Sequence, residues 1–382
     1  MEPVKRIIDH KKFAQKRFSS ADCIVVKIGS SLLVDNSTNL IREEWLYSVA
    51  SDVADLMSQG KKIVIVSSGS IALGRKILGI TAEHLGLEES QAAAAVGQIN
   101  LAQAYQRILN VHEITSGQIL VTAEDSRNRR RYLNSRATLL KLLEMGVVPI
   151  VNENDTVATD EIRFGDNDRL AAQVASLCDA HILVLLSDVD GLFEANPRQN
   201  QQARLIPVVT QITDKIENMA DDEYNSISKG GMKTKIEAAK VSVAAGCNLI
   251  ITNGRNANPL RKLIAGGVAT WFISHDDPIT SRKQWIFNTK AKGKIFIDQG
   301  AQSALRRGKS LLPAGVVRIE GRFERGDTVV VLSSDGRFLA NGLTDYSYKE
   351  VELIKGRRSS EIQDILGHPG RAVLIHRNNM AM

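Results

Sequence analysis

The residues best suited to chemistry lie in a short stretch rich in glycine and lysine, late in the chain. Gly230 and Gly231 are adjacent, and three lysines stand beside them, at Lys229, Lys233 and Lys235. Glycine lets a backbone approach a phosphate closely, and the amphipathic run that follows predicts a helix whose N-terminus offers free N–H groups and a positive dipole end. The stretch therefore predicts an anion cradle for the phosphates of a nucleotide. The alternative is a surface loop with solvated lysines.

A second lysine in an unusual position is Lys27. It lies near the end of the apolar segment Cys23 to Ile28, which predicts a buried strand, and Gly29-Ser30-Ser31 follows at once. Burying a lysine is costly unless an anion pairs with it. Lys27 is therefore a candidate anion-binding residue, and the alternative is a lysine whose ammonium group reaches solvent at the strand edge.

The next strand, expected over residues 62–67, ends in Ser67-Ser68-Gly69-Ser70. Gly69 and Gly74 have the spacing of a P-loop, but Arg75-Lys76 follows where that motif requires Lys and then Ser or Thr. This departure excludes a Walker A motif. What remains is a strand-to-helix turn of serine and glycine, which is suited to a pocket of N–H and hydroxyl groups.

Two clusters of Asn and Asp occupy the middle of the chain. Asn152-Glu153-Asn154-Asp155 follows an apolar strand at 147–151, and Gly165-Asp166-Asn167-Asp168 stands where a helix of about 168–178 would begin. Helix capping and Asx-turns explain one such cluster more easily than both. A further strand, at 181–186, ends in Ser187-Asp188. We therefore expect these polar groups to belong to a site.

The elements that must position these residues alternate along the chain. Apolar strand segments are separated by amphipathic helices, which is the signature of an α/β fold with a mostly parallel sheet covered on both faces, a three-layer αβα sandwich. Ligands of such sheets bind beyond the carboxyl ends of the strands. By that rule Lys27, Ser67-Ser68 and the residues after Val151 lie along one edge of the sheet.

The length of 382 residues allows two domains. Residues 1–20 are expected to form a basic tail or a short helix, residues 21–275 the α/β body, and residues 276–290 a polar linker. From residue 291 to residue 376, short strands separated by glycine-rich turns predict a small β-rich module.

Composition narrows the class of protein. Hydrophobic residues make up 43% of the chain and charged residues 24%, as in soluble globular proteins, and no apolar run approaches the roughly 20 residues of a membrane helix. The first 20 residues lack the apolar core of a secretion signal. Cys23, Cys178 and Cys247 lie far apart without metal-binding spacing, which favours buried free thiols and a cytoplasmic location.

Charge is unevenly distributed. Residues 291–382 carry fifteen Lys and Arg against ten acidic residues, whereas residues 20–290 carry 28 against 31. The central body is therefore not a nucleic-acid-binding surface by charge, but the C-terminal module is a candidate for one.

Taken in order, these motifs closely resemble the glutamate 5-kinase family of the amino acid kinase superfamily, and the C-terminal module is similar to a PUA domain. The resemblance covers roughly residues 22–375. The Gly-Gly-Met-x-Thr-Lys motif at 230–235 is shared across the superfamily, whereas Asn152 to Asp155 followed by Gly165 to Asp168, with a PUA-like tail, is specific to this branch.

The resemblance implies phosphorylation of the side-chain carboxylate of L-glutamate by ATP, with Mg²⁺. It implies that Lys27 and Lys235 contact the phosphates and that Asp168 holds both lysines. It further implies the following binding residues: for glutamate, Ser68, Asn152, Asp155 (paired with the α-ammonium group) and Asn167; for ATP, Lys27, Ser187, Asp188, Lys229, Gly230, Gly231, Met232, Lys233, Thr234 and Lys235. No metal ligand is indicated.

The same resemblance implies inhibition by proline and a homo-oligomer, either a dimer or a tetramer. Lys229 and Lys233 make the phosphate loop more basic than the family pattern leads us to expect. Two alternatives stay open. The fold could act on another acceptor, such as N-acetylglutamate, aspartate, carbamate or a nucleoside monophosphate, or the chain could bind RNA through its PUA-like module.

Overall fold

The computed structural model describes residues 9–35, 37–82, 84–158, 167–197, 199–219 and 231–382. The chain forms two compact units. The first comprises residues 1–127 and 134–278, and the second comprises residues 128–133 and 279–382. Each unit is described by itself below.

The first unit is built on an eight-stranded sheet in the order β3-β4-β2-β1-β5-β7-β8-β6. Its ladders are parallel except for the antiparallel pair β7 and β8. The predicted mostly parallel sheet is thereby confirmed. The strands are β1 (Cys23–Ile28), β2 (Lys62–Ser67), β3 (Ser116–Val121), β4 (Val148–Glu153), β5 (Ile182–Ser187), β6 (Val208–Val209), β7 (Asn248–Asn253) and β8 (Ala269–Phe272).

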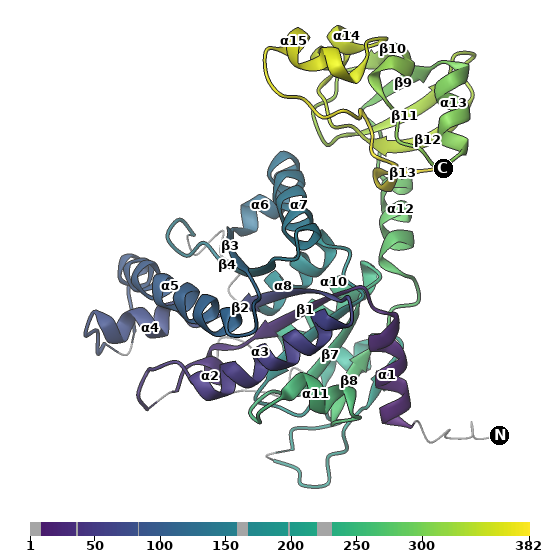
Figure 1. Ribbon diagram of the computed structural model, residues 1–382. Coiled ribbons are helices and arrows are strands. Elements are labelled where there is room, and N and C mark those ends of the chain that lie inside the picture. The colour runs from purple at the N-terminus through teal and green to yellow at the C-terminus, as the bar shows by residue number, and fades with distance from the viewer. Residues whose placement is uncertain (1–8, 36, 83, 159–166, 198, 220–230) are drawn as a thin grey trace, which may run out of the picture. The chain divides into compact units, whose positions relative to one another are not determined.

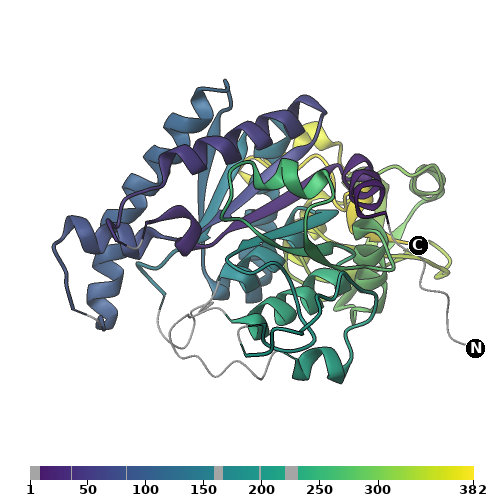
Figure 2. The same cartoon turned by 90° about the horizontal axis from the view of Figure 1, so that it is seen from below.

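Helices cover both faces of this sheet, as the α/β prediction requires. Figures 1 and 2 show α3 and α11 on one face and α8 and α10 on the other. Among the described residues, no helix combines the length and the apolar character needed to cross a bilayer. The helices are α1 (His10–Ser20), α2 (Ser30–Leu33), α3 (Glu43–Ser58), α4 (Ser70–Ile77), α5 (Leu87–Asn110), α6 (Ala123–Arg127), α7 (Arg129–Glu144), α8 (Asn167–Leu177), α9 (Asp214–Asn218), α10 (Met232–Ala244) and α11 (Pro259–Ile264).

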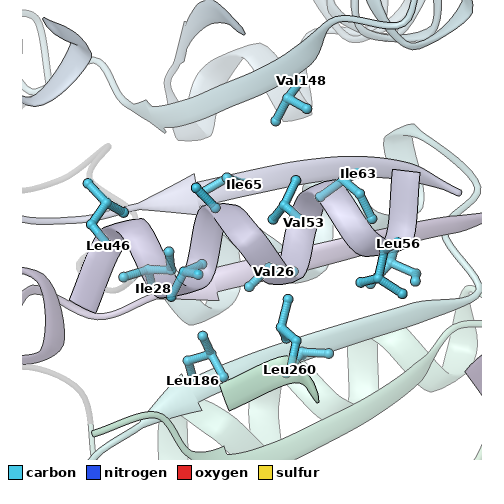
Figure 3. Packing of buried hydrophobic residues seen from close by; sticks show 14 of the residues in the cluster. Val26, Ile28, Leu46, Val53, Leu56, Ile63, Ile65, Val148, Leu186 and Leu260 are labelled. Carbon is cyan, nitrogen blue, oxygen red and sulfur yellow. The ribbon is translucent and has the colours of Figure 1, made fainter. Parts of the chain in front are cut away.

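The core under α3 shows why β1 can carry a polar side chain. Successive side chains of a strand point to opposite faces, and Val26 and Ile28 pack in the hydrophobic cluster beneath α3. Figure 3 shows both residues beneath that helix, which contributes Leu46 and Val53 to the cluster. Each large aliphatic side chain buried here stabilises the fold by about 1.5–3 kcal/mol. The alternate face of β1, which carries Lys27, is turned toward α8.

Residues 10–20 form the helix α1, so of the two forms expected for this segment, a basic tail or a short helix, the structure has the helix. Asp9 caps it by accepting a hydrogen bond from the backbone N–H of Lys12 at 3.1 Å. Phe13 and Phe18 meet the ring of Trp271 edge-on, at centroid distances of 5.2 and 6.1 Å. Aromatic contacts of this kind explain why a basic segment lies against the first unit.

The second unit holds a five-stranded mixed sheet in the order β10-β9-β11-β12-β13, which agrees with the predicted β-rich module. Residues 276–290, expected as a polar linker, contain helix α12, whose Ile286 is buried against Leu343 and Ala381. The elements are α12 (Pro278–Asn288), β9 (Gly293–Ile297), α13 (Gln299–Arg306), β10 (Val316–Gly321), β11 (Thr328–Ser333), β12 (Phe338–Leu343), α14 (Tyr348–Ile354), α15 (Ile362–Leu366) and β13 (Met380–Ala381).

Candidate active site

Three charged side chains from separate elements meet at the carboxyl edge of the sheet. Lys27 lies at the end of β1, Asp168 in the first turn of α8, and Lys235 in the first turns of α10. The Lys27 ammonium nitrogen lies 2.6 Å from Asp168 Oδ1, and that of Lys235 lies 3.0 Å from Asp168 Oδ2. The structure thus brings together the three residues that the sequence suggested for catalysis.

This triad, Lys27–Asp168–Lys235, is buried. Lys27 and Lys235 are only 8% and 6% exposed, and Asp168 is fully buried. Burial alone would raise the pKa of the Asp168 carboxyl, but the charges of Lys27 and Lys235 outweigh it and hold that pKa below its usual range. Asp168 is therefore ionised at neutral pH, and the triad carries two positive charges and one negative charge.

The N-terminus of α10 approaches the same carboxylate. Gly231 is the N-cap residue of the helix and has no side chain to cap it. Thr234 donates its hydroxyl to Gly231 O at 2.8 Å, and its Oγ1 lies 3.4 Å from Asp168 Oδ2. Met232 and Lys233 complete the first turn, with Lys233 exposed. A helix N-terminus with adjacent lysines suits an anion.

Two of the predicted phosphate-loop residues, Lys229 and Gly230, lie outside the described residues, as do Gly165 and Asp166 of the second Asn/Asp cluster. Their proposed roles stay predictions.

A network of amides and hydroxyls lies next to the triad. Asn167, the residue before Asp168, donates its Nδ2 to Ser68 Oγ at 2.8 Å, to the backbone carbonyl of Ser67 at 2.9 Å, and to Asn152 Oδ1 at 2.9 Å. Ser67 ends β2, and Asn152 is the last residue but one of the neighbouring strand β4. Their closeness agrees with the strand-end rule, by which groups at the carboxyl ends of neighbouring parallel strands lie side by side.

Asp155 joins this network through Ser70. The Ser70 hydroxyl lies 3.4 Å from Asp155 Oδ2 and 3.4 Å from Asn152 Nδ2. Asn152 Nδ2 also donates to Gln98 Oε1, on helix α5, at 2.8 Å. Gln98 could not be singled out from the sequence, because it stands in an alanine-rich helix. All four residues predicted to bind the substrate therefore belong to one connected set.

Ser187 and Asp188 lie at the end of β5, and the structure does not connect them to the triad. Among the described residues, their side-chain polar contacts run to each other at 3.3 Å and from Asp188 to Arg255 at 3.7 Å. Asp188 and Arg255 line a cavity of about 520 Å³ with Ser31, Val34, Asp35, Ser37 and Arg42. Arg255 is the second residue after the end of β7, so the strand-end rule could have singled it out.

No group of three or more His, Cys, Asp or Glu side chains that could hold a metal ion occurs in the described part of the chain. The three cysteines are buried and free, and Cys23 Sγ lies 3.7 Å from Cys178 Sγ. Burial raises the pKa of the Cys247 thiol well above its ordinary value, so this group is inert at neutral pH.

Comparison with known families places these residues in context. The amino acid kinase family model matches residues 22–253, and the PUA domain model matches residues 293–366. The chain is 56% identical over 364 residues to glutamate 5-kinase from Dinoroseobacter shibae, which covers 95% of this chain and 99% of that protein. It is 57% identical over 364 residues to glutamate 5-kinase from Roseobacter denitrificans, covering 95% of this chain and 97% of that protein.

Among solved structures, carbamate kinase from Giardia lamblia bound to AMP-PNP matches with a TM-score of 0.49 and 16% identity, over 67% of this chain and 99% of that one.

Proposed function

The chain belongs to the glutamate 5-kinase family, and we propose that it transfers the γ-phosphoryl group of ATP to the side-chain carboxylate of L-glutamate, giving L-glutamyl 5-phosphate and ADP. This reaction is the first step of proline biosynthesis. The observation that carries the proposal is the buried Lys27–Asp168–Lys235 triad beside a network of amides and hydroxyls.

The acceptor needs no general base. A glutamate side chain has a pKa of about 4.3, so it is already ionised at neutral pH. The obstacle is that an anionic carboxylate must approach an anionic phosphate. Catalysis must therefore come from alignment and from neutralisation of charge, which fixed cations in a buried site provide.

In this scheme Lys27 and Lys235 hold the transferring phosphoryl group. Asp168 fixes both ammonium groups before the substrates arrive, because its two oxygens each bind one of them, at 2.6 and 3.0 Å. The N-terminal end of the α10 dipole adds a partial positive charge near the same place. The cations are thereby preorganised and do not have to move during transfer.

ATP would extend from the triad along the N-terminal turn of α10. Gly231, Met232 and Thr234 lie in or before that turn, and we assign them to the phosphates together with Lys229, Gly230 and Lys233. Ser187 and Asp188, at the end of β5, are assigned to the nucleotide because they share the carboxyl edge of the sheet with Lys27.

Glutamate would lie across the amide network. Asn167 precedes Asp168 in the chain and donates to Ser68 Oγ, so we assign both residues to the γ-carboxylate that is phosphorylated. Asp155, at the other end of the network beyond Ser70, is placed to pair with the α-ammonium group. Asn152 connects the two ends.

Mg²⁺ would arrive with the phosphates of ATP, where it neutralises part of their charge. We assign this ion to the nucleotide and give it no protein ligand. The roles assigned above therefore rest on the side chains alone.

The test is an assay of ADP release with ATP, Mg²⁺ and L-glutamate, paired with trapping of the acyl phosphate as a hydroxamate. Turnover with L-glutamate is expected. Absence of turnover with L-glutamate, together with turnover of N-acetylglutamate, aspartate or carbamate, would reject the proposal and assign the fold to a different acceptor.

The variant Asp155→Asn separates these acceptors. It removes the carboxylate that a free α-ammonium group requires, and an acetylated amine does not need that charge. We expect KM for L-glutamate to rise about tenfold or more, as for a lost charge-assisted hydrogen bond, while KM for ATP stays within a factor of two. An unchanged KM for L-glutamate would remove Asp155 from the substrate site.

Further roles rest on the family resemblance: inhibition by proline, assembly into a dimer or tetramer, a cytoplasmic location, and RNA binding by the PUA region. The charge of residues 291–382 supports the last of these, with fifteen basic against ten acidic residues. The assay above, run with and without proline, tests the inhibition. A filter-binding titration with tRNA at rising salt tests the RNA contact, whose affinity must fall with salt if it is electrostatic.

A further inference from the structure

Gln98 presents an unsatisfied hydrogen-bond donor inside the candidate site. Its Oε1 accepts a hydrogen bond from Asn152 Nδ2 at 2.8 Å. Its Nε2 is buried and has no hydrogen-bond partner within the part of the chain that the structure describes. A buried donor that is left without a partner costs about 1–3 kcal/mol, and such groups in native proteins call for an explanation.

The packing of two helices places Gln98 there. A Cβ on Gly97 would lie 1.8 Å from the carbonyl oxygen of Ser70, and one on Gly74 would lie 1.7 Å from that of Ala93. The backbones of α4 and α5 therefore touch at two glycines, which only residues without a side chain allow. This close crossing brings the residue after Gly97 against the end of β4.

The orientation of the Gln98 amide follows from a chain of hydrogen bonds that begins at a backbone carbonyl. Ser67 O can only accept, so Asn167 must turn its NH₂ group toward it. The same NH₂ group donates to Asn152 Oδ1, which turns Asn152 Nδ2 toward Gln98. Gln98 must then accept with Oε1. Its NH₂ group therefore stands at the end of this chain of hydrogen bonds. Reversing the amide would set two donors face to face.

We propose that Gln98 is a substrate-binding residue whose Nε2–H donates a hydrogen bond to the α-carboxylate of the amino acid. This proposal rests on the proposed function. An NH₂ group requires an acceptor, so it cannot bind the α-ammonium group, and a carboxylate is the acceptor that the substrate offers beyond the one that reacts.

The order of residues along the network agrees with this role. Asn167 adjoins the triad, Asn152 lies in the middle, and both Gln98 and the Ser70–Asp155 pair contact Asn152 from the far side. Asp155 for the α-ammonium group and Gln98 for the α-carboxylate together recognise the zwitterionic end of an amino acid. The γ-carboxylate is thereby directed toward Lys27.

The experiment compares Gln98→Ala with Gln98→Glu. Both variants lose the donor, but the glutamate side chain keeps an oxygen that accepts from Asn152 Nδ2 and brings a negative charge. If Gln98 serves only to hold Asn152, Gln98→Glu retains the wild-type KM for L-glutamate and Gln98→Ala does not. If Gln98 donates to a carboxylate, Gln98→Glu is the worse variant, because it repels the substrate.

We expect KM for L-glutamate to rise about tenfold in Gln98→Ala, as for a lost hydrogen bond to a charged group, and further in Gln98→Glu. KM for ATP is expected to stay within a factor of two in both variants, which also reports that they fold. Gln106→Ala, an exposed glutamine on the same helix, is the control and is expected to match the wild type.

The inference is overturned if Gln98→Glu matches the wild type, if neither variant changes KM for L-glutamate, or if KM for ATP rises in parallel. Failure of the proposed function gives a different result. In that case the wild-type protein itself shows no ADP release with L-glutamate, whereas failure of the inference leaves an active wild type and variants that do not follow the expected order.

Discussion

The substitution Asp168→Asn tests whether this carboxylate organises both lysines. It keeps the size of the side chain and removes its charge, and the ammonium groups of Lys27 and Lys235 lie 2.6 and 3.0 Å from its oxygens. At an effective dielectric constant of about 20, a contact of this length corresponds to about 5 kcal/mol of attraction before the cost of desolvation. Removing one partner of a buried ion pair costs about 3–5 kcal/mol in practice.

We therefore expect Asp168→Asn to lower the free energy of unfolding of the first unit by about 3 kcal/mol, a large part of the roughly 5–15 kcal/mol of a typical domain. Urea unfolding followed by tryptophan fluorescence reports it, because Trp45 and Trp271 are buried in this unit. Asp55→Asn is the matched control. Asp55 pairs with Arg261 at the surface, where such pairs contribute at most about 1 kcal/mol.

The same substitution releases two lysines from their fixed positions, so we expect kcat to fall about 100- to 1000-fold, the effect of losing a preorganised charge in an active site. KM for L-glutamate should change less than fivefold, because the amide network stays in place. A variant that unfolds within 1 kcal/mol of the wild type and retains kcat within threefold would refute the role given to Asp168.

Three other predictions follow from the same geometry. The pKa of Asp168 lies below its ordinary value of 3.8. The difference in free energy of unfolding between the wild type and Asp168→Asn should therefore be fully present above about pH 4 and shrink as the pH falls further. A difference that grows in acid would contradict this. Lys27→Ala and Lys235→Ala should each lower kcat at least 100-fold. The control is Lys240→Ala, which changes an exposed lysine on α10 that pairs with Glu217 and should leave kcat unchanged. Equal effects on kcat in all three variants would remove the triad from catalysis. Gly97→Ala should destabilise the fold by about 1–3 kcal/mol and raise KM for L-glutamate, since the new methyl group would meet Ser70 O at 1.8 Å; urea unfolding and steady-state kinetics check both.

The strand-end rule accounts for most of the site that could be predicted from the sequence. Lys27, Ser67 and Asn152 each lie at or near the end of an apolar run, and parallel strands bring their carboxyl ends to one edge. That reasoning needs only the pattern within each segment. It placed Asn152 beside Ser68 without knowledge of the contact that joins them through Asn167.

Contacts that depend on how helices cross could not be predicted in this way. Gln98 looks like any polar residue of an alanine-rich helix, and its position depends on the close approach of Gly97 to α4. A short helix was one of the two forms expected for residues 1–20, but the docking of α1 could not be predicted, because it depends on Trp271, far along the chain. Such pairings are set by tertiary packing, which local sequence patterns do not record.

One carboxylate between two lysines has an electrostatic advantage over two lysines alone and over two lysines with two carboxylates. Two buried lysines without Asp168 would repel each other and carry the full cost of desolvation. Two carboxylates would cancel both charges and leave nothing for a phosphate. With one carboxylate, fully buried and held ionised by its neighbours, the two lysines are held in fixed positions and the triad still carries one more positive charge than negative charge. In the proposed reaction, Lys27 and Lys235 turn that charge toward the transferring phosphoryl group without leaving Asp168, so the cations are arranged during folding rather than during the reaction.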